Sequence, residues 1–109
     1  MIKLSIIIPV FNEEKTISEL LRRVLFVNLP FGIKKEIIVI SDGSTDNTDK
    51  ILARKKKIKY LRHDRNLGKG AAIKTGLKTS TGDLIIIQDA DLEYDPSYYM
   101  QLLRPIMQN

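Results

Sequence analysis

A regular alternation of apolar runs and helix-like patterns constrains the fold of this chain more than any other feature. Short apolar runs, rich in β-branched residues, predict four strands at residues 3–8, 36–40, 58–61 and 84–87. Helical patterns follow them at about residues 12–25, 47–56, 68–79 and 95–106. Strands that alternate with helices form parallel sheets through right-handed crossovers. We therefore expect an α/β fold with three layers, α/β/α, around a mostly parallel, four-stranded, Rossmann-like sheet, with the uniformly apolar 84–87 run as a central strand.

Capping residues and apolar spacing predict where the helices begin and which faces they bury. Asn12 is a candidate N-cap for the first helix, and Gly76 indicates that the third helix packs closely against the sheet. Asp95, followed by Pro96, is typical of the start of the last helix, which Pro105 should kink or end. The buried faces would be Ile17, Leu20, Leu21, Val24 and Leu25 in the first helix, and Tyr99, Leu102, Leu103 and Ile106 in the last.

The composition fits one small domain that spans residues 1–109. No apolar run approaches the roughly 20 residues of a membrane helix, and the absence of cysteine excludes disulfides and fits a cytoplasmic, reducing location. The chain has 18 Lys and Arg against 13 Asp and Glu, and this net charge of +5 suits a phosphate-bearing ligand or an anionic surface. The basic cluster at residues 54–57 is either a solvated helix end or a contact with the cytoplasmic face of a membrane. Nucleic-acid binding is disfavoured, because no aromatic residues interleave the basic ones.

Acidic residues follow three of the predicted strands, at what should be one edge of the sheet. Glu13 follows the first strand, Asp42 the second, and Asp89 and Asp91 the fourth. Ligands bind at this carboxyl edge in parallel α/β sheets, and gathered carboxylates repel one another unless a cation joins them. Residues two apart point to the same side of an extended chain, so Asp89 and Asp91 could share one Mg²⁺ or Mn²⁺, with small Ala90 leaving room for a ligand. The alternative is a turn that ends the strand, with Asp91 as a local cap.

Other polar residues give less specific signals. Asp42 could accept hydrogen bonds from a base or a ribose, whereas Asp46 is better explained as a helix cap. Residues 65–70 (RNLGKG) are basic and precede a helix, so backbone amides and Lys69 are candidates for binding phosphate. Close packing and a helix start explain the glycines of this segment equally well. No nucleophile set can be assembled, and His63 is expected to form a surface pair with the neighbouring Asp.

Four motifs together resemble the family-2 glycosyltransferases of the GT-A fold. They are residues 6–13 (IIIPVFNE), 38–46 (IVISDGSTD), 66–72 (NLGKGAA) and 88–96 (QDADLEYDP), in the order and at the spacing of the family. Within that family, the chain is most similar to the dolichyl- or polyprenyl-phosphate sugar synthases. One departure is Ser41, where the family often has a second acid. The other is length, because family members continue well past this point, and the chain would be the N-terminal part of a longer, here truncated, GT-A enzyme.

The resemblance implies a donor site and a reaction. The nucleoside pocket would be lined by Pro9, Phe11, Glu13, Ile40 and Asp42. The diphosphate and its Mg²⁺ or Mn²⁺ would be held by Asp89, Ala90 and Asp91, with Asp89 and Asp91 as metal ligands and Asp91 as the catalytic residue. The implied reaction transfers a sugar from a UDP- or GDP-linked donor, with inversion, to an acceptor that is expected to be a polyprenyl or dolichyl phosphate.

Two other interpretations remain. The chain could be a catalytically incomplete module that only binds a nucleotide, or that dimerises through an exposed sheet edge. It could also be a receiver-like flavodoxin fold, in which acidic strand ends bind Mg²⁺. The acids here follow different strands, however, and no suitably placed lysine follows a fifth strand, which disfavours the second interpretation.

Overall fold

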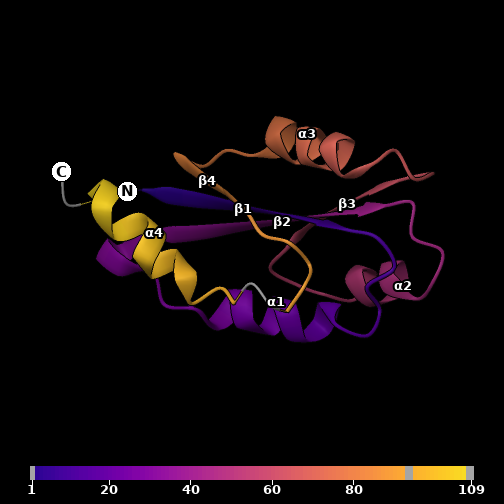
Figure 1. Cartoon of the computed structure of the whole chain (residues 1–109), viewed down its shortest axis with the longest axis horizontal. Helices are drawn as coiled ribbons and strands as arrows, with labels where there is room; N and C mark the ends of the chain where they lie inside the picture. Colours follow the sequence, from indigo (N-terminus) through magenta and orange to yellow (C-terminus); the bar gives the residue numbers. More distant parts are fainter. Residues whose placement is uncertain (1, 93–94, 108–109) are drawn as a thin grey trace.

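The computed structural model describes residues 2–92 and 95–107 of the chain. Its elements, in order, are β1 (Lys3–Val10), α1 (Ile17–Phe26), the 3₁₀ turn η1 (Pro30–Gly32), β2 (Lys34–Asp42), α2 (Thr48–Ala53), β3 (Lys59–His63), α3 (Lys69–Thr79), β4 (Leu84–Ile87) and α4 (Tyr98–Met107). The strands form one parallel sheet in the order β3-β2-β1-β4 (Figure 1). The predicted α/β fold is confirmed, but β4 lies at the edge of this sheet and not at its centre.

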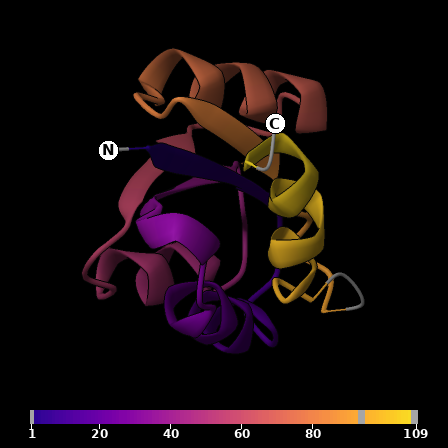
Figure 2. The same ribbon diagram turned by 90° about the vertical axis from the view of Figure 1, so that its left-hand side faces the viewer.

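The helices form a layer on each face of the sheet, as Figures 1 and 2 show. Alternate residues of β1 divide between the two faces, because side chains of a strand point to opposite sides. Ile6 and Ile8 belong to the larger core under α1, α2 and α4, whereas Ile7 belongs to a smaller core under α3. The prediction of three layers, α/β/α, is therefore confirmed. Within the part of the chain that the structure describes, no helix combines the length and apolarity needed to cross a membrane.

Gly76 lets α3 pack directly on the centre of the sheet. A Cβ atom added at Gly76 would lie 2.6 Å from Cγ2 of Ile7 and 2.9 Å from Cδ1 of Ile40. Neither distance leaves room for even a methyl group, so the predicted close packing of this helix is confirmed. The close approach also sets the distance between α3 and the sheet, and with it the position of the start of α3 at the carboxyl edge.

The first helix begins later than its sequence suggested. α1 starts at Ile17, and its N-cap is Thr16 and not Asn12. Asn12 instead has a left-handed backbone (φ 52°), and its side chain bonds to the loop that follows β2. The prediction of Asn12 as an N-cap was wrong, because a contact between two loops replaces the local helix start.

The outer surface near β4 and α4 carries exposed apolar side chains. Leu102 and Ile106 are 55% and 54% exposed, so the predicted buried face of the last helix is reduced to Tyr99 and Leu103. α4 runs past Pro105 to Met107, so this proline does not end the helix. The side chains of β4 that face the α3 side are exposed as well, because α3 covers β1 and β2 but not the edge strand.

A buried carboxylate organises the opposite, N-terminal edge of the sheet. Glu36 is 8% exposed and accepts hydrogen bonds from Ser5 Oγ (2.6 Å), Lys59 Nζ (2.6 Å) and both the amide and the hydroxyl of Thr81 (2.8 and 2.7 Å). Burial alone would raise the pKa of Glu36, but the bonds from Lys59, Ser5 and Thr81 outweigh it and hold this pKa well below its usual range. The network joins β1, β2 and β3 far from the carboxyl edge.

Candidate functional site

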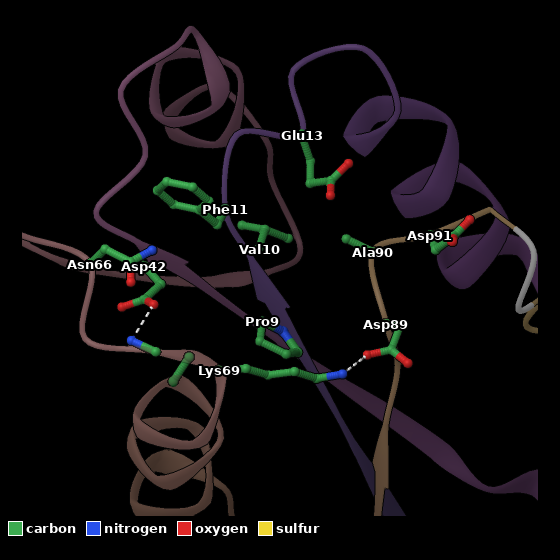
Figure 3. A pocket seen from close by; sticks show the side chains of 12 residues that line it. Pro9, Val10, Phe11, Glu13, Asp42, Asn66, Lys69, Asp89, Ala90 and Asp91 are labelled. Carbon is green, nitrogen blue, oxygen red and sulfur yellow. Dashed lines mark hydrogen bonds and ion pairs between the residues drawn. The ribbon is translucent and has the colours of Figure 1, made fainter.

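A cavity of about 390 Å³ opens at the carboxyl edge of the sheet. Its walls come from the ends of β1, β2 and β4 and from the start of α3 (Figure 3). The lining residues are Pro9, Val10, Phe11, Glu13, Asp42, Asn66, Gly68, Lys69, Ala72, Asp89, Ala90 and Asp91. Residues from four separate parts of the sequence therefore meet where parallel α/β sheets bind their ligands.

With one exception, every site residue predicted from the sequence lies on this cavity. The exception is Ile40, which is fully buried in the core beneath α3, with its side chain packed close to the backbone of Gly76. Its side chain lies on the same face of β2 as that of Asp42 but two residues earlier in the strand, where it belongs to the small core with Ile7 and Ala72. The assignment of Ile40 to a ligand pocket is therefore corrected to a packing role.

Lys69 and Asp89 form an ion pair inside the cavity. The ammonium comes from the first residue of α3, and the carboxylate lies two residues past the end of β4. Both side chains keep contact with solvent, at 59% and 38% exposure. The ammonium of Lys69 thus contacts Asp89, one of the two carboxylates that the sequence analysis assigns to a metal ion (Figure 3).

Asp91 lines the same cavity but lies on the other side of Ala90, and its carboxylate points away from Lys69 (Figure 3). β4 ends at Ile87, so the extended-chain geometry assumed for Asp89 and Asp91 does not apply. No group of three or more His, Cys, Asp or Glu that could hold a metal occurs within residues 2–92 and 95–107. Two carboxylates on one cavity nevertheless fit a hard cation that takes its remaining oxygens from water and phosphate.

A buried pair of polar side chains anchors the segment that carries these carboxylates. The hydroxyl of Tyr99, on α4, donates to Oε1 of Gln88 at 2.7 Å, and both residues are at least 96% buried. The backbone amide of Gln88 donates to the carbonyl of Ile7 at 2.8 Å. The residue immediately before Asp89 is therefore tied both to the central strand and to α4.

Two loops on the far side of the cavity are bonded to each other. Oδ1 of Asn12 accepts a hydrogen bond from the amide of Thr45 at 2.7 Å, and the amide of Glu13 donates to Oγ1 of Thr48 at 2.9 Å. Asp46 accepts from the amide and hydroxyl of Thr48 at the start of α2, but the N-cap of this helix is Asn47 and not Asp46 as predicted. These two bonded loops, after β1 and β2, form what we call the braced rim. Phe11, 44% exposed, projects from the braced rim over the cavity.

The carboxylate of Asp42 accepts hydrogen bonds from other residues of the chain, whereas the sequence suggested that it would accept them from a ligand. It is 3% exposed, and its carboxylate accepts from the amide of Leu67 (2.9 Å), the amide of Gly68 (2.8 Å) and Nδ1 of His63 (2.7 Å). Burial raises the pKa of Asp42, but the bonds from His63, Leu67 and Gly68 outweigh it, so this pKa lies below its usual range. Asp42 therefore fixes the loop before α3.

His63 was missed as part of the site. It was expected to pair with Asp64, but its side chain is 11% exposed and bridges Asp42 to Oγ1 of Thr75, which lies 2.8 Å from Nε2. Asp64 instead faces Arg62 at 3.7 Å and is 97% exposed. The available signal was strand register: His63 ends a strand that pairs in parallel with β2, which places it beside Asp42.

Gly43 allows the same loop to approach the end of β2. Its φ is +71°, and a Cβ atom there would lie 2.3 Å from the carbonyl carbon of Arg65 and 2.3 Å from the amide nitrogen of Asn66. Only glycine combines this backbone conformation with this contact. Gly68 (φ +103°) and Gly70 have no neighbour within 4 Å of such an atom, so close packing does not explain them.

Comparison with known proteins found a matching family and several similar structures. Residues 5–109 match the model of the family described as glycosyl transferase family 2. Among solved structures, TarS of Staphylococcus aureus (residues 1–349) is 28% identical with a TM-score of 0.79. A mannosyltransferase of Pyrobaculum calidifontis, solved with GDP-Man and Mn²⁺, is 29% identical with a TM-score of 0.73. Glucosyl-3-phosphoglycerate synthase of Mycobacterium tuberculosis, solved with Mn²⁺, UDP and glucosyl-3-phosphoglycerate, is 26% identical with a TM-score of 0.80.

These matches cover most of the present chain but only a part of each relative. They span 97%, 81% and 99% of this chain, in the same order, and 32%, 27% and 40% of the other chains. The chain therefore spans less than half the length of each of these relatives.

Proposed function

Since the chain belongs to glycosyl transferase family 2, we propose that its cavity binds the nucleotide diphosphate of an activated sugar, together with a divalent cation. The observation that supports this proposal is the order of chemical groups along one cavity. An apolar wall at Pro9 and Phe11 suits a base, a lysine at a helix start suits a phosphate, and two carboxylates suit a cation. Structures of relatives contain UDP, or GDP-Man with Mn²⁺, which supports a nucleotide and a divalent cation as the ligands.

Each group of the chain has a distinct part in this proposal. Phe11 covers the base from the braced rim, and Glu13 and Asp42 border the nucleoside. Lys69, together with the open backbone at Gly68, faces the diphosphate. The residues that would hold Mg²⁺ or Mn²⁺ are Asp89 and Asp91, and the bound ion would neutralise charge on the departing nucleotide.

The reaction we propose for the complete enzyme is transfer of the sugar to an acceptor with inversion at the anomeric carbon. A polyprenyl or dolichyl phosphate is the acceptor we favour, because an anionic oxygen is already a nucleophile and needs little help from a base. With such an acceptor, the basic cluster at residues 54–57 would face an anionic membrane. The chain itself is proposed to bind the donor, which can be tested apart from turnover.

Calorimetric titration of UDP and GDP, each with and without Mn²⁺, tests the proposal on the chain as it is. We expect one of the nucleotides to bind more tightly with Mn²⁺, and Asp91→Asn to remove most of this gain. Asp64→Asn is the matched control, because Asp64 is 97% exposed and lies outside the cavity. Binding that is equally strong without metal, in both wild type and Asp91→Asn, would contradict the metal assignment. No binding of either nucleotide would contradict the function.

A non-catalytic role is the second candidate, and a separate observation favours it. β4 is an edge strand without charged residues, and its Ile85 and Ile87 are 44% and 40% exposed. Natural edge strands are usually protected by charges or by a covering element, so this edge is suited to pairing with a further strand. A dimer formed by two such edges would appear in analytical ultracentrifugation, and Ile85→Lys should abolish it.

A further inference from the structure

One short loop supplies the side of the cavity opposite the acidic segment, by which we mean residues 88–91 with Asp89 and Asp91. This loop, residues 64–68, joins β3 to α3 and brings Asn66 and Gly68 to the cavity wall. It also sets the start of α3, where Lys69 reaches across to Asp89. The loop is largely exposed, with Leu67 at 50%, so its own apolar contacts hold it weakly. Its position must depend on the polar bonds that attach it to the sheet.

Those bonds converge on the carboxylate of Asp42. The amides of Leu67 and Gly68 both donate to it, one to each oxygen. Hydrogen bonds to a charged, buried acceptor are stronger than bonds between neutral groups. The direction of the two amides is thus set by the direction of one side chain at the end of β2.

His63 in turn fixes the direction of that carboxylate. Its Nδ1 shares Oδ1 of Asp42 with the amide of Leu67, and its Nε2 lies 2.8 Å from the hydroxyl of Thr75 on α3. That hydroxyl also contacts the carbonyl of Ala71 at 3.1 Å. The imidazole therefore connects Asp42, at the end of β2, to Thr75 on α3.

We propose that His63 is a positioning residue for the ligand of this cavity: through Asp42 it fixes the 64–68 loop and the start of α3, and hence Asn66, Gly68 and Lys69. His63 does not line the cavity itself. The part of this inference that concerns binding rests on the proposed function. The mechanical part, from His63 to the amides of Leu67 and Gly68, does not.

A pair of substitutions of nearly equal size separates this role from general packing. In His63→Asn, the side-chain amide can still donate to Asp42 from the position of Nδ1, whereas His63→Leu has the same shape and no donor. We expect His63→Leu to weaken the binding of UDP or GDP with Mn²⁺ by about tenfold, as the loss of one hydrogen bond to a charged group implies. His63→Asn should stay within about threefold of wild type, because its donor remains.

Amide hydrogen exchange, followed by NMR, provides a readout that needs no ligand. The amides of Leu67 and Gly68 should exchange about tenfold faster in His63→Leu than in His63→Asn, because their acceptor loses its support. Ser5→Ala is the control for lost stability: Ser5 also belongs to a buried polar network, but at the opposite edge of the sheet. It should lower the melting temperature without changing nucleotide affinity or the exchange of these two amides relative to the rest of the sheet.

The outcomes distinguish the two proposals. Equal affinity and equal exchange in His63→Leu and His63→Asn would overturn the positioning role, and so would a loss of affinity in Ser5→Ala as large as that in His63→Leu. If wild type binds neither nucleotide but the exchange difference is present, the proposed function fails and the positioning role stands. Should His63→Leu not fold, Thr75→Val decides: it must speed the exchange of Leu67 and Gly68, or the inference is wrong.

Discussion

The ammonium of Lys69 and the carboxylate of Asp89 meet across the cavity, although one begins α3 and the other follows β4. Their contact joins the two walls between which a diphosphate would lie (Figure 3). A divalent cation would need oxygen atoms of the same carboxylate. In the proposed metal site, the lysine and the ion would therefore compete for Asp89, and a bound phosphate would draw the lysine away from it.

Lys69→Met tests this competition. Without the ammonium, Mn²⁺ alone should bind about twofold to fivefold more tightly. This factor corresponds to the free energy that an exposed ion pair typically contributes. The nucleotide with Mn²⁺ should bind more weakly, because a phosphate contact is lost. Calorimetry of metal and of nucleotide measures the two changes separately.

Lys74→Met is the control for that experiment, since Lys74 is exposed on the same helix and lies outside the cavity. It removes the same charge and should change neither affinity appreciably. Weaker binding of Mn²⁺ alone in Lys69→Met would contradict the competition between the lysine and the metal.

Gly43→Ala should be among the most harmful small substitutions in this chain. Its Cβ atom would lie 2.3 Å from the backbone of the 64–68 loop, and φ is already +71°. We expect a loss of about 2–4 kcal/mol in the free energy of unfolding, from overpacking and backbone strain together. Gly70→Ala is the control: it has open space and a helical position, so stability should rise by about 0.5–1 kcal/mol. Urea denaturation measures both changes.

Tyr99→Phe should loosen the attachment of the acidic segment to α4. The substitution removes the 2.7 Å bond from the hydroxyl to Gln88 in a buried environment, which should cost about 0.5–1.5 kcal/mol of stability. Affinity for Mn²⁺ in the presence of nucleotide should also fall, because Asp89 follows Gln88 directly. Tyr98→Phe, at a 52% exposed position, should change neither quantity. Equal effects of the two substitutions would show that the buried bond has no part in holding the segment.

Glu36→Gln should flatten the acid limb of the stability curve. The pKa of Glu36 is held below its usual value in the folded protein, so on acidification the unfolded chain takes up the proton first. The stabilisation is complete above the ordinary carboxyl pKa, about 4.3, and is lost as the pH falls below that value toward the folded pKa.

Urea midpoints measured from pH 7 down to pH 3 test this dependence. Wild type should lose more stability over this interval than Glu36→Gln, which starts less stable at neutral pH. The exposed Asp64→Asn variant should retain the slope of the wild type. A Glu36→Gln curve as steep as that of the wild type would show that another acid is responsible.

Periodicity in the sequence was sufficient to predict the elements and the layers. A parallel sheet places the ends of its strands at one edge by geometry alone, so the position of the cavity and its acidic residues followed from where the apolar runs end. Pro9 and Phe11 followed only from the family resemblance. The order of the strands did not follow in the same way. β4 is apolar on both faces, which usually indicates a central position, yet among the described residues it pairs only with β1.

Two of the side chains that were assigned wrongly have partners that are distant in the sequence. Asn12 has the composition of a helix cap, but its partners are Thr45 and Asp46 in another loop. His63 has an acid beside it in the sequence, but the acid it contacts lies on β2. In both cases the local interpretation was chemically reasonable, and a tertiary contact that no local pattern encodes replaced it.

The central place of β1 has a consequence for how the chain acquires its structure. Ile6 pairs with Ile37 on one side and with Ile86 on the other, so both neighbours of the first strand come from later parts of the chain. No tight turn can join parallel strands, so no local hairpin offers an early nucleus. Folding must wait for contacts between remote segments and should be slow for a domain of this size. During synthesis, β1 leaves the ribosome before both of its neighbours, and its edge next to β4 stays unpaired until residues 84–87 have followed.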